Sequence, residues 1–321
     1  MPPYVLGMMT SKLGISFFRG LIIMVIAGMM LPGCSQQLDL LKIVGKSFSY
    51  EFRHPVKPPA ARLKIFPPDN PGIHAGWVGH STVLLSFYGN QILFDPNFSS
   101  RIKIARRAVE LPIQPEEIKD LDFILITHAH YDHFDLDSLK RLPRKAQLIV
   151  PRGCKPLVEK LGFPSVTEID WNQTLEVRGV RIEAIRPAHW GRRSPWHDEG
   201  WGYNSYLLSK NGKAILFSGD TGYTKIFGEK GQNQKLFLAF FPISAYKPDW
   251  FQVNHCTPEQ ALQMFRESGA ECMIPIHWGT FIISHEPPEE PLERLKAEVK
   301  RLGMEDRVII LQHGESFTVP E

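Results

Sequence analysis

Four residues that can ligate metal ions lie within positions 128–133 of this 321-residue chain, where the sequence reads HAHYDH. Imidazole nitrogen suits zinc and neighbouring transition metals, and a carboxylate can bind or bridge such ions. Residues two apart in an extended loop point to the same side, so His128 and His130 can bind one ion. A turn after His130 can then direct Asp132 and His133 toward a second ion. The segment therefore predicts a two-metal site.

Three more candidate ligands, His189, Asp220 and His277, each follow an apolar run of the kind that forms a buried strand. Strands that end at the same rim of a sheet bring their following loops together, and such loops carry function on a rigid scaffold. We therefore expect these side chains to converge on the 128–133 cluster.

Alternating strand-like and helix-like segments run from Ile73 to the end of the chain. The sequence predicts strands at 77–87, 92–94, 121–127, 147–150, 180–185, 204–208, 214–218, 236–243, 272–276 and 308–311. It predicts helices at 135–142, 157–161, 258–268 and 291–302. Such alternation favours a layered α/β domain over a bundle or a sandwich. Prolines crowd the segment before it, which predicts a linker or a strap lying on the domain.

The first 34 residues have the composition of a secretory signal. Lys12 and Arg19 precede an apolar run over 21–31, which is shorter than the ~20 residues of a comfortable membrane span. The run ends in LPGC, which resembles a bacterial lipobox despite Pro32, and implies that Cys34 is lipidated and becomes the mature N-terminus. We expect a membrane-anchored lipoprotein of the bacterial cell envelope. An uncleaved N-terminal anchor and a cytosolic protein with a misassigned start are the alternatives.

The charge balance argues against a nucleic-acid partner. The chain has 37 Lys and Arg against 34 Asp and Glu, and a nucleic-acid-binding domain normally shows a basic excess along one face. The cysteines other than Cys34 are Cys154, Cys256 and Cys272, and none has CxxC spacing. Three thiols make no disulfide framework, and we expect Cys154 and Cys272 to be small buried apolar residues.

Several segments carry a family resemblance. HAHYDH matches the HxHxDH signature of the metallo-β-lactamase superfamily, and PAHW at 187–190, FSGDTG at 217–222 and IHWGT at 276–280 match its later ligand segments. Residues 73–319 are more narrowly similar to the N-acylphosphatidylethanolamine-hydrolysing phospholipase D family and its bacterial relatives. The narrower match lies in WVGHST at 77–82, LFDP at 93–96, GRR at 191–193, WGY at 201–203 and VNH at 253–255.

The resemblance implies an α/β domain with the four-layer αββα fold over residues 73–321, after a signal peptide at 1–34 and a linker or strap at 35–72. It also implies seven metal ligands. The first ion is held by His128, His130 and His189. The second is held by Asp132, His133 and His277, and Asp220 bridges both.

Two further residues take roles from the same resemblance. Asp95 corresponds to an acidic residue beneath the site that orients a ligand. His255 corresponds to a histidine near the substrate, which binds phosphate or assists proton transfer. A turn-forming Asp before Pro96 and an ordinary loop histidine are the alternatives.

The expected cofactors are two Zn²⁺ ions, although a His-rich site with two carboxylates also suits Mn or Fe. Two ions ~3.5–4 Å apart can share a water and lower its pKa, giving a hydroxide that attacks phosphorus or a carbonyl carbon. Asp132 or His255 would transfer the proton during hydrolysis. The resemblance and the lipid-anchor signal favour a phosphodiesterase acting on N-acylphosphatidylethanolamine-like phospholipids. A lactonase, another hydrolase of this fold and a non-catalytic envelope lipoprotein are the alternatives, and the complete ligand set argues against the last.

Aromatic and basic side chains accompany the candidate ligands. An aromatic rim would suit a lipid-like substrate, whereas core packing is the usual role of tryptophan. The tryptophans in question are Trp190, Trp196, Trp201, Trp250 and Trp278. Arg192 and Arg193 follow His189 and could bind a phosphate, with solvated surface charge as the alternative.

Overall fold

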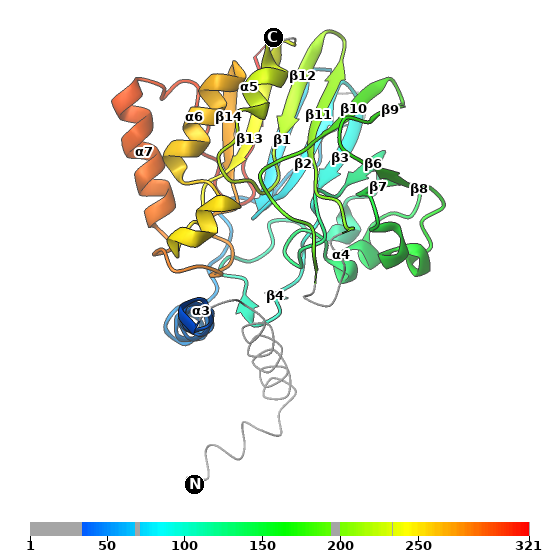
Figure 1. The fold of residues 1–321 in the computed structure, drawn as a ribbon. Helices are drawn as coiled ribbons and strands as arrows, with labels where there is room; N and C mark the ends of the chain where they lie inside the picture. Colours follow the sequence, from blue (N-terminus) through cyan, green and yellow to red (C-terminus); the bar gives the residue numbers. More distant parts are fainter. Residues whose placement is uncertain (1–33, 68–70, 194–199, 233, 321) are drawn as a thin grey trace.

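Two mixed β-sheets packed face to face, with helices on both outer sides, form the body of the protein (Figure 1). The structure is a computed structural model that describes residues 34–67, 71–193, 200–232 and 234–320. The architecture is the αββα arrangement of the metallo-β-lactamase fold, as the sequence predicted. The predicted signal peptide lies outside the described residues except for Cys34.

The first sheet has the strand order β15-β1-β2-β3-β6-β7-β8. Its strands are β1 Ile73–Gly79, β2 Thr82–Phe87, β3 Asn90–Phe94, β6 Phe123–Leu125, β7 Gln147–Pro151, β8 Val166–Ile169 and β15 Ser316–Thr318. Alternate side chains serve two cores: Leu85 and Phe123 face the second sheet, whereas Leu84 and Ile124 face the outer helices. Burial on both faces explains why these strands read as continuous apolar runs.

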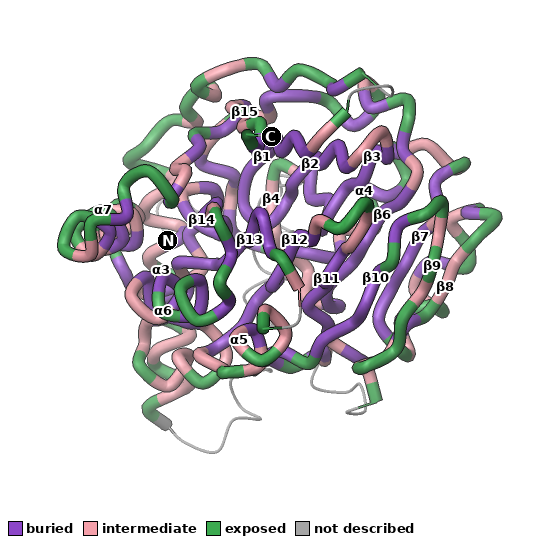
Figure 2. The backbone as a smooth tube through the Cα atoms, turned by 90° about the horizontal axis from the view of Figure 1, so that it is seen from above, coloured by how far each residue is buried: buried purple, intermediate pink, exposed green. Residues whose placement is uncertain are grey.

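The second sheet has the order β14-β13-β12-β11-β10-β9. Its strands are β9 Thr174–Val177, β10 Val180–Ile185, β11 Ser205–Lys210, β12 Lys213–Phe217, β13 Leu236–Pro242 and β14 Cys272–Ile276. Phe94 of the first sheet stacks on Phe217 of the second at a ring distance of 4.1 Å. Figure 2 shows the central strands buried, with exposed residues on the surrounding helices and loops and on the edge strand β9.

Helices cover the outer face of each sheet. Helix α4 Leu136–Arg141 and the 3-10 helices η2 Lys155–Leu157 and η3 Glu159–Leu161 lie on the first sheet, and α5 Ile226–Gly231, α6 Pro258–Ser268 and α7 Glu290–Leu302 lie on the second. Thr257 and Gln260 form a capping box at the start of α6, and Gly269 ends it with a φ of +69°. That left-handed conformation suits glycine because it lacks a Cβ.

Several elements complete the chain. A helix, α3 Cys34–Arg53, precedes the domain, and a small hairpin, β4 Arg101–Ile102 with β5 Ala105–Arg106, lies at the same end of the sandwich as α3 (Figure 1). The 3-10 helices η1 Pro115–Glu117 and η4 Asp249–Val253 lie in connecting loops. No helix in the described ranges is both long and apolar enough to cross a bilayer.

The structure corrects several predicted elements. The predicted strand 77–87 is broken by a turn at His80 and Ser81, and 308–311 forms only one bridge, Val308 to Met273, whereas β15 is the last strand. The predicted helix 157–161 is replaced by η2 and η3. Strands β8 and β9 and helix α5 were not predicted. The linker or strap predicted for 35–72 contains helix α3, because the prolines that suggested an irregular segment begin only at Pro55.

Candidate metal centre

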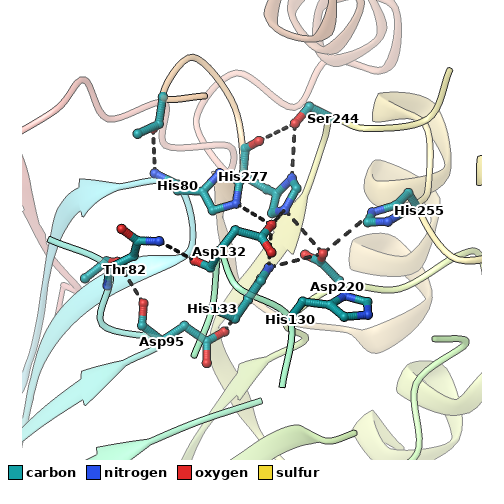
Figure 3. Close-up of polar contacts among 12 residues, drawn as sticks. His80, Thr82, Asp95, His130, Asp132, His133, Asp220, Ser244, His255 and His277 are labelled. Carbon is teal, nitrogen blue, oxygen red and sulfur yellow. Dashed lines mark hydrogen bonds and ion pairs between the residues drawn. The ribbon is translucent and has the colours of Figure 1, made fainter. Parts of the chain in front are cut away.

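The candidate ligands meet at one end of the sandwich, on loops from both sheets. Figure 3 shows Asp132, His133, Asp220 and His277 directed toward one another. The first sheet contributes the turn between β1 and β2, the loop after β3 and the 128–133 loop after β6. The second contributes the loops after β10, β12 and β14, and the segment after η4 adds one more side chain. The structure thus brings together all nine residues that the sequence singled out as ligands or their neighbours: His128, His130, Asp132, His133, His189, Asp220, His277, Asp95 and His255.

Asp220 lies at the centre of the cluster. Its Oδ2 is 3.2 Å from Nε2 of both His133 and His277, 3.6 Å from Nδ1 of His255 and 4.0 Å from Nε2 of His128. Oδ1 is buried and has no hydrogen-bond partner among the described residues. One carboxylate therefore faces histidines from both sides of the site, which is the position that a bridging ligand needs.

One group of ligand atoms consists of three imidazoles. The ligand atoms of His128, His130 and His189 lie within 4.8 Å of one another. Thr127 Oγ1 lies 2.9 Å from His128 Nδ1, and the carbonyl oxygen of Asn254 lies 2.9 Å from His189 Nδ1. These contacts fix the ring orientations. Burial lowers the pKa of His130 to about 4 and those of His128 and His189 well below the usual value, so the group is neutral at pH 7.

A second group combines carboxylate and imidazole. The ligand atoms of His80, Asp132, His133 and His277 also lie within 4.8 Å of one another. Asp132 Oδ2 is 3.4 Å from Nε2 of both His133 and His277. Burial alone would lower the pKa of each histidine, but the carboxylates of Asp220 and Asp132 raise the pKa of His277 to about 9 and that of His133 well above its usual value.

Asp95 lies beneath the second group and makes three hydrogen bonds. It accepts from the backbone N–H of Thr127 at 2.7 Å and from the Thr127 hydroxyl at 2.6 Å, and its Oδ2 lies 2.7 Å from Nδ1 of His133. The carboxylate thereby turns Nε2 of His133 toward Asp132 and Asp220. Gly219 packs against the same threonine, and a Cβ at 219 would lie 2.8 Å from the Thr127 Cβ. The absence of a side chain at 219 thus lets the two sheets meet closely below the ligands.

Sequence reasoning missed one member of the cluster, His80. Its Nε2 lies 2.9 Å from Asp132 Oδ2, and its ring centroid is 3.9 Å from that of His277. The carbonyl of His80 accepts hydrogen bonds from the Trp77 indole at 2.8 Å and from the backbone N–H of His277 at 2.9 Å. A signal was available in the WVGHST segment at 77–82, but its histidine was not assigned because residues 77–87 were predicted to form one strand.

The residues present fit metal ions. Buried nitrogen atoms Nε2 of His130, His133 and His277 lack a hydrogen-bond partner within the described part of the chain, as does Oδ1 of Asp220. Buried polar atoms are rarely left without partners in native structures, and imidazole and carboxylate together form the donor set of transition-metal sites. The cluster therefore has the composition and burial of a metal centre.

A cavity of about 350 Å³ opens above the cluster. Its floor consists of His130, Asp132, Asp220 and His255. Its walls come from α3, the β4–β5 hairpin, η4 and the loops near 190 and 282, and contain Ile43, Ser47, Ile102, Lys103, Ile104, Ala105, Tyr131, Trp190, Arg192, Arg193, Ala245, Phe251, Ile282 and Ile283. The metal cluster is thus reached through a largely apolar chamber.

The Arg193 guanidinium contacts the metal-binding loop. It donates to the carbonyls of Ala129 at 3.1 Å and Phe134 at 2.7 Å, and it lies 4.1 Å from the Tyr131 ring centroid. Arg193 therefore braces the backbone of the metal-binding loop and is more than a solvated surface charge. Both Arg192 and Arg193 line the cavity, so a phosphate-binding role stays a prediction for each.

Of the tryptophans near the candidate ligands, one lines the cavity and the others described pack elsewhere. Trp190 lines the cavity and is 44% exposed. Trp278 is buried and stacks on Trp77 at 5.0 Å, and Trp250 donates a hydrogen bond to Asp39 of α3. Trp201 packs on the core under the first sheet. Trp196 lies outside the described residues, so one of the five, Trp190, is placed at the rim.

Fold and site together define a metal-dependent hydrolase. The family model described as the beta-lactamase superfamily domain matches residues 90–278, and the chain belongs to the metallo-β-lactamase superfamily. An uncharacterized protein of Mycobacterium tuberculosis is 32% identical over 263 residues, which cover 76% of this chain and 70% of that protein. The mitochondrial N-acyl-phosphatidylethanolamine-hydrolyzing phospholipase D of Saccharomyces cerevisiae is 33% identical over 76% of this chain and 55% of its own length.

A second relative of the same name, the N-acyl-phosphatidylethanolamine-hydrolyzing phospholipase D 1 of Caenorhabditis elegans, is 30% identical over 70% of this chain and 69% of its own length. Solved structures share the fold at lower identity. An isothiocyanate hydrolase from Delia radicum gut bacteria matches with a TM-score of 0.63 and 18% identity, over 76% of this chain and 98% of that one. A metallo hydrolase from Ignicoccus hospitalis matches with a TM-score of 0.59 and 21% identity, over 78% and 99%.

Proposed function

We propose that this protein is a phosphodiesterase of the phospholipase D type that hydrolyses N-acylphosphatidylethanolamine-like lipids with two zinc ions. The observation that carries the proposal is the largely apolar cavity whose floor is the buried His/Asp cluster. An apolar chamber accommodates acyl chains while the cluster engages the polar headgroup. Similarity to the yeast and nematode phospholipases supports the same substrate class.

In this proposal one ion would be held by His128, His130 and His189 and the other by Asp132, His133 and His277. Asp220, which lies between the two groups, would serve both ions. Bound zinc would supply Lewis acidity toward a phosphoryl oxygen and activate a water at neutral pH. Manganese and iron are alternatives for the same donor set.

His255 is better placed than Asp132 to transfer a proton. Oδ2 of Asp132 already lies 2.9 Å from His80 Nε2 and 3.4 Å from the Nε2 atoms of His133 and His277. His255 lines the cavity, its Nδ1 is 3.6 Å from Asp220 Oδ2 and has no hydrogen-bond partner among the described residues. Burial lowers the pKa of His255, so its neutral ring can accept a proton at pH 7.

Basic side chains line the cavity that a phosphodiester would fill. Lys103 and Arg192 line the cavity together with Trp190. The Lys103 ammonium lies 3.5 Å from the Tyr131 ring centroid, and Arg192 lies 6.0 Å from that of Trp190. Their positive charges suit a single negative phosphate, and Ile43, Ile104 and Ile282 nearby suit its acyl chains.

We also propose that the protein is held at a bacterial envelope membrane through a lipidated Cys34, with an uncleaved N-terminal anchor as the alternative. The basic residues, the apolar run and the LPGC motif before α3 support this location. The substrate would then lie in the membrane to which the protein is tethered.

The test is an assay of the full chain, with its metal content measured, on vesicles that contain N-acylphosphatidylethanolamine. We expect release of N-acylethanolamine and phosphatidic acid, loss of this release with a chelator, and recovery on adding zinc. His255→Gln should lower kcat about 10²-fold or more while the metal content is retained. His54→Gln, at an exposed residue of the segment after α3, is the matched control.

Fully metal-loaded protein that releases neither product would contradict the proposal. Hydrolysis of lactones or thioesters in place of the diester would favour the lactonase alternative. A chain that binds no metal would favour a non-catalytic lipoprotein.

A further inference from the structure

Helix α3 is fixed to the domain by one of its faces. Ile43, Val44 and Ser47 are buried, and Ile43 and Ser47 form part of the cavity wall. The ammonium of Lys46 donates to the carbonyl of His285 at 2.8 Å, and the Trp250 indole donates to the Asp39 carboxylate at 3.3 Å. The helix is therefore a docked part of the site.

The opposite face of α3 is apolar and exposed. Leu38, Leu41 and Phe52 are 56%, 45% and 67% exposed. Successive residues of a helix are 100° apart, so these three side chains fall on one stripe, roughly opposite Ile43 and Ser47. Three of the six large apolar residues that are exposed in the described part of the chain belong to this one helix. An apolar stripe of this kind usually has a partner.

Charge on α3 is divided between the two faces. The acids, Asp39 and Glu51, lie toward the domain, where Glu51 pairs with Arg101. Lys42 and Arg53 lie beside the exposed stripe. Lys42 is 69% exposed, and its contact with Asp39 at 3.5 Å is a surface ion pair of little strength. The outward half of α3, which we call the outer face (Leu38, Leu41, Lys42, Phe52 and Arg53), is thus apolar and basic.

This combination identifies the partner as a lipid surface. Interfacial helices place an apolar stripe among acyl chains and flanking Lys and Arg side chains among anionic headgroups. A second copy of α3 fits less well. Although the spacing resembles a coiled-coil seam, pairing two outer faces would bring basic residues together with no acid between them.

Position along the chain gives the same answer. Helix α3 begins at Cys34, immediately after the apolar run 21–31. It extends for 20 residues, or about 30 Å. It lies at the same end of the molecule as the β4–β5 hairpin, which also lines the cavity (Figure 1). Ile43 and Ser47 reach into the cavity from the helix whose other side carries the outer face.

We propose that the outer face of α3 docks flat on the surface of an anionic phospholipid bilayer, so that one helix contacts the membrane on one side and walls the active-site cavity on the other. The inference rests on the proposed membrane location. A lipid leaving the bilayer beside α3 would then meet the apolar cavity wall without crossing open water.

Hydroxyl-radical footprinting of the full chain in vesicles tests this docking directly, because oxidation reports the solvent exposure of individual side chains. We expect Phe52 and Leu41 to be oxidised several-fold more slowly in phosphatidylcholine–phosphatidylglycerol vesicles than in pure phosphatidylcholine vesicles. Ile65, which is 40% exposed and lies off the helix, is the internal reference and should not change.

The double variant K42E/R53E should lose this protection while the N-terminal apolar run still holds it in the vesicles. The matched control K140E, which reverses an exposed charge on α4, should behave as the parent chain. Circular dichroism checks that each variant is folded, and the comparison of the two vesicle types in the parent chain needs no variant.

Equal oxidation of Phe52 in both vesicle types would overturn the proposal. Protection that appears without anionic lipid and grows with protein concentration would identify a second copy instead, which also overturns it. Hydrolysis of bis(4-nitrophenyl) phosphate, a water-soluble diester, tests the proposed activity separately, and K42E/R53E should leave it unchanged.

Discussion

The two groups of ligands in the metal centre differ in their charge. His128, His130 and His189 form a group without a carboxylate of its own, and burial lowers the pKa of each so that all three rings are neutral. The other group places Asp132 among imidazoles, and the carboxylates of Asp220 and Asp132 raise the pKa values of His133 and His277, which favours their charged forms. Burial lowers the pKa of the fourth member, His80, to about 3.

The two groups therefore reduce the free-energy cost of burying polar side chains in two different ways. The neutral group avoids charge, and the Nε2 atoms of His128 and His189 lie 2.9 and 3.3 Å from Nδ1 of His130. The charged group neutralises its carboxylates with protons, which an incoming cation must displace. Asp220 contacts both groups, so the two solutions are coupled through one side chain.

Removing the shared carboxylate should have the largest effect. Asp220→Asn is expected to lower kcat about 10³-fold or more, because both groups lose the charge that stabilises their cations. Elemental analysis should show metal loss, and circular dichroism should show the fold retained. Asp137→Asn, at an exposed carboxylate on α4, is the control and should leave kcat unchanged. If Asp220→Asn keeps the activity of the unsubstituted protein, neither group depends on the Asp220 carboxylate.

Proton release should separate the two groups during metal binding. Zinc entering the charged group must displace the protons on His133 and His277, so affinity there rises as pH increases toward the His277 pKa of about 9. The neutral group is already deprotonated and should show a much weaker dependence. Isothermal titration calorimetry measures the protons released: zinc is added to the metal-free protein in buffers that differ in ionisation enthalpy. Release of the same number of protons by the first and the second zinc ion would contradict this difference between the two groups.

A residue outside the seven expected ligands should affect one group only. His80→Asn removes the ring beside Asp132 and His277 while keeping a side chain that tolerates the φ of +53° at this position. We expect the charged group to lose about 10–100-fold in metal affinity, measured by chelator competition, and the other to keep its affinity. Arg178→Asn changes another left-handed residue, at an exposed surface, and is the control. If His80 is itself a ligand, His80→Asn should bind only one metal ion.

The smallest effect is expected at Arg193, which supports the loop that supplies ligands to both groups. Arg193→Met leaves the carbonyls of Ala129 and Phe134 without this donor and should lower stability by about 1–3 kcal/mol. Thermal unfolding measures the loss, and KM should change little. Arg192→Met should show the reverse pattern, a raised KM with an unchanged Tm. A large KM effect at Arg193 would favour the phosphate-ligand role instead.

Much of the site could be predicted because its ligands follow strands. The HAHYDH segment is dense enough to indicate a metal site by itself, and His189, Asp220 and His277 come after apolar runs that end at one rim of the sandwich. The fold followed from the alternation of elements together with the family motifs. Local patterns at strand ends therefore carried most of the information.

The missed features depend on contacts between distant residues. His80 was hidden because residues 77–87 look like one strand, although Gly79, with a φ of +134°, permits the turn. The bracing role of Arg193 depends on carbonyls that lie 64 and 59 residues away. Helix α3 was missed because apolar residues on two opposite faces obscure the single helical stripe that sequence reading seeks.

Gly219 has a consequence for anyone who would redesign the enzyme for other substrates. Even a methyl group there would collide with Thr127 and disturb Asp95, so this position should tolerate no replacement in a mutant library. The hairpin 101–106 and Trp190 line the cavity and are absent from the ligand groups, so they offer room for variation. We expect new substrate specificities to evolve by substitutions in these cavity walls, while glycine is retained at position 219 beneath the ligands.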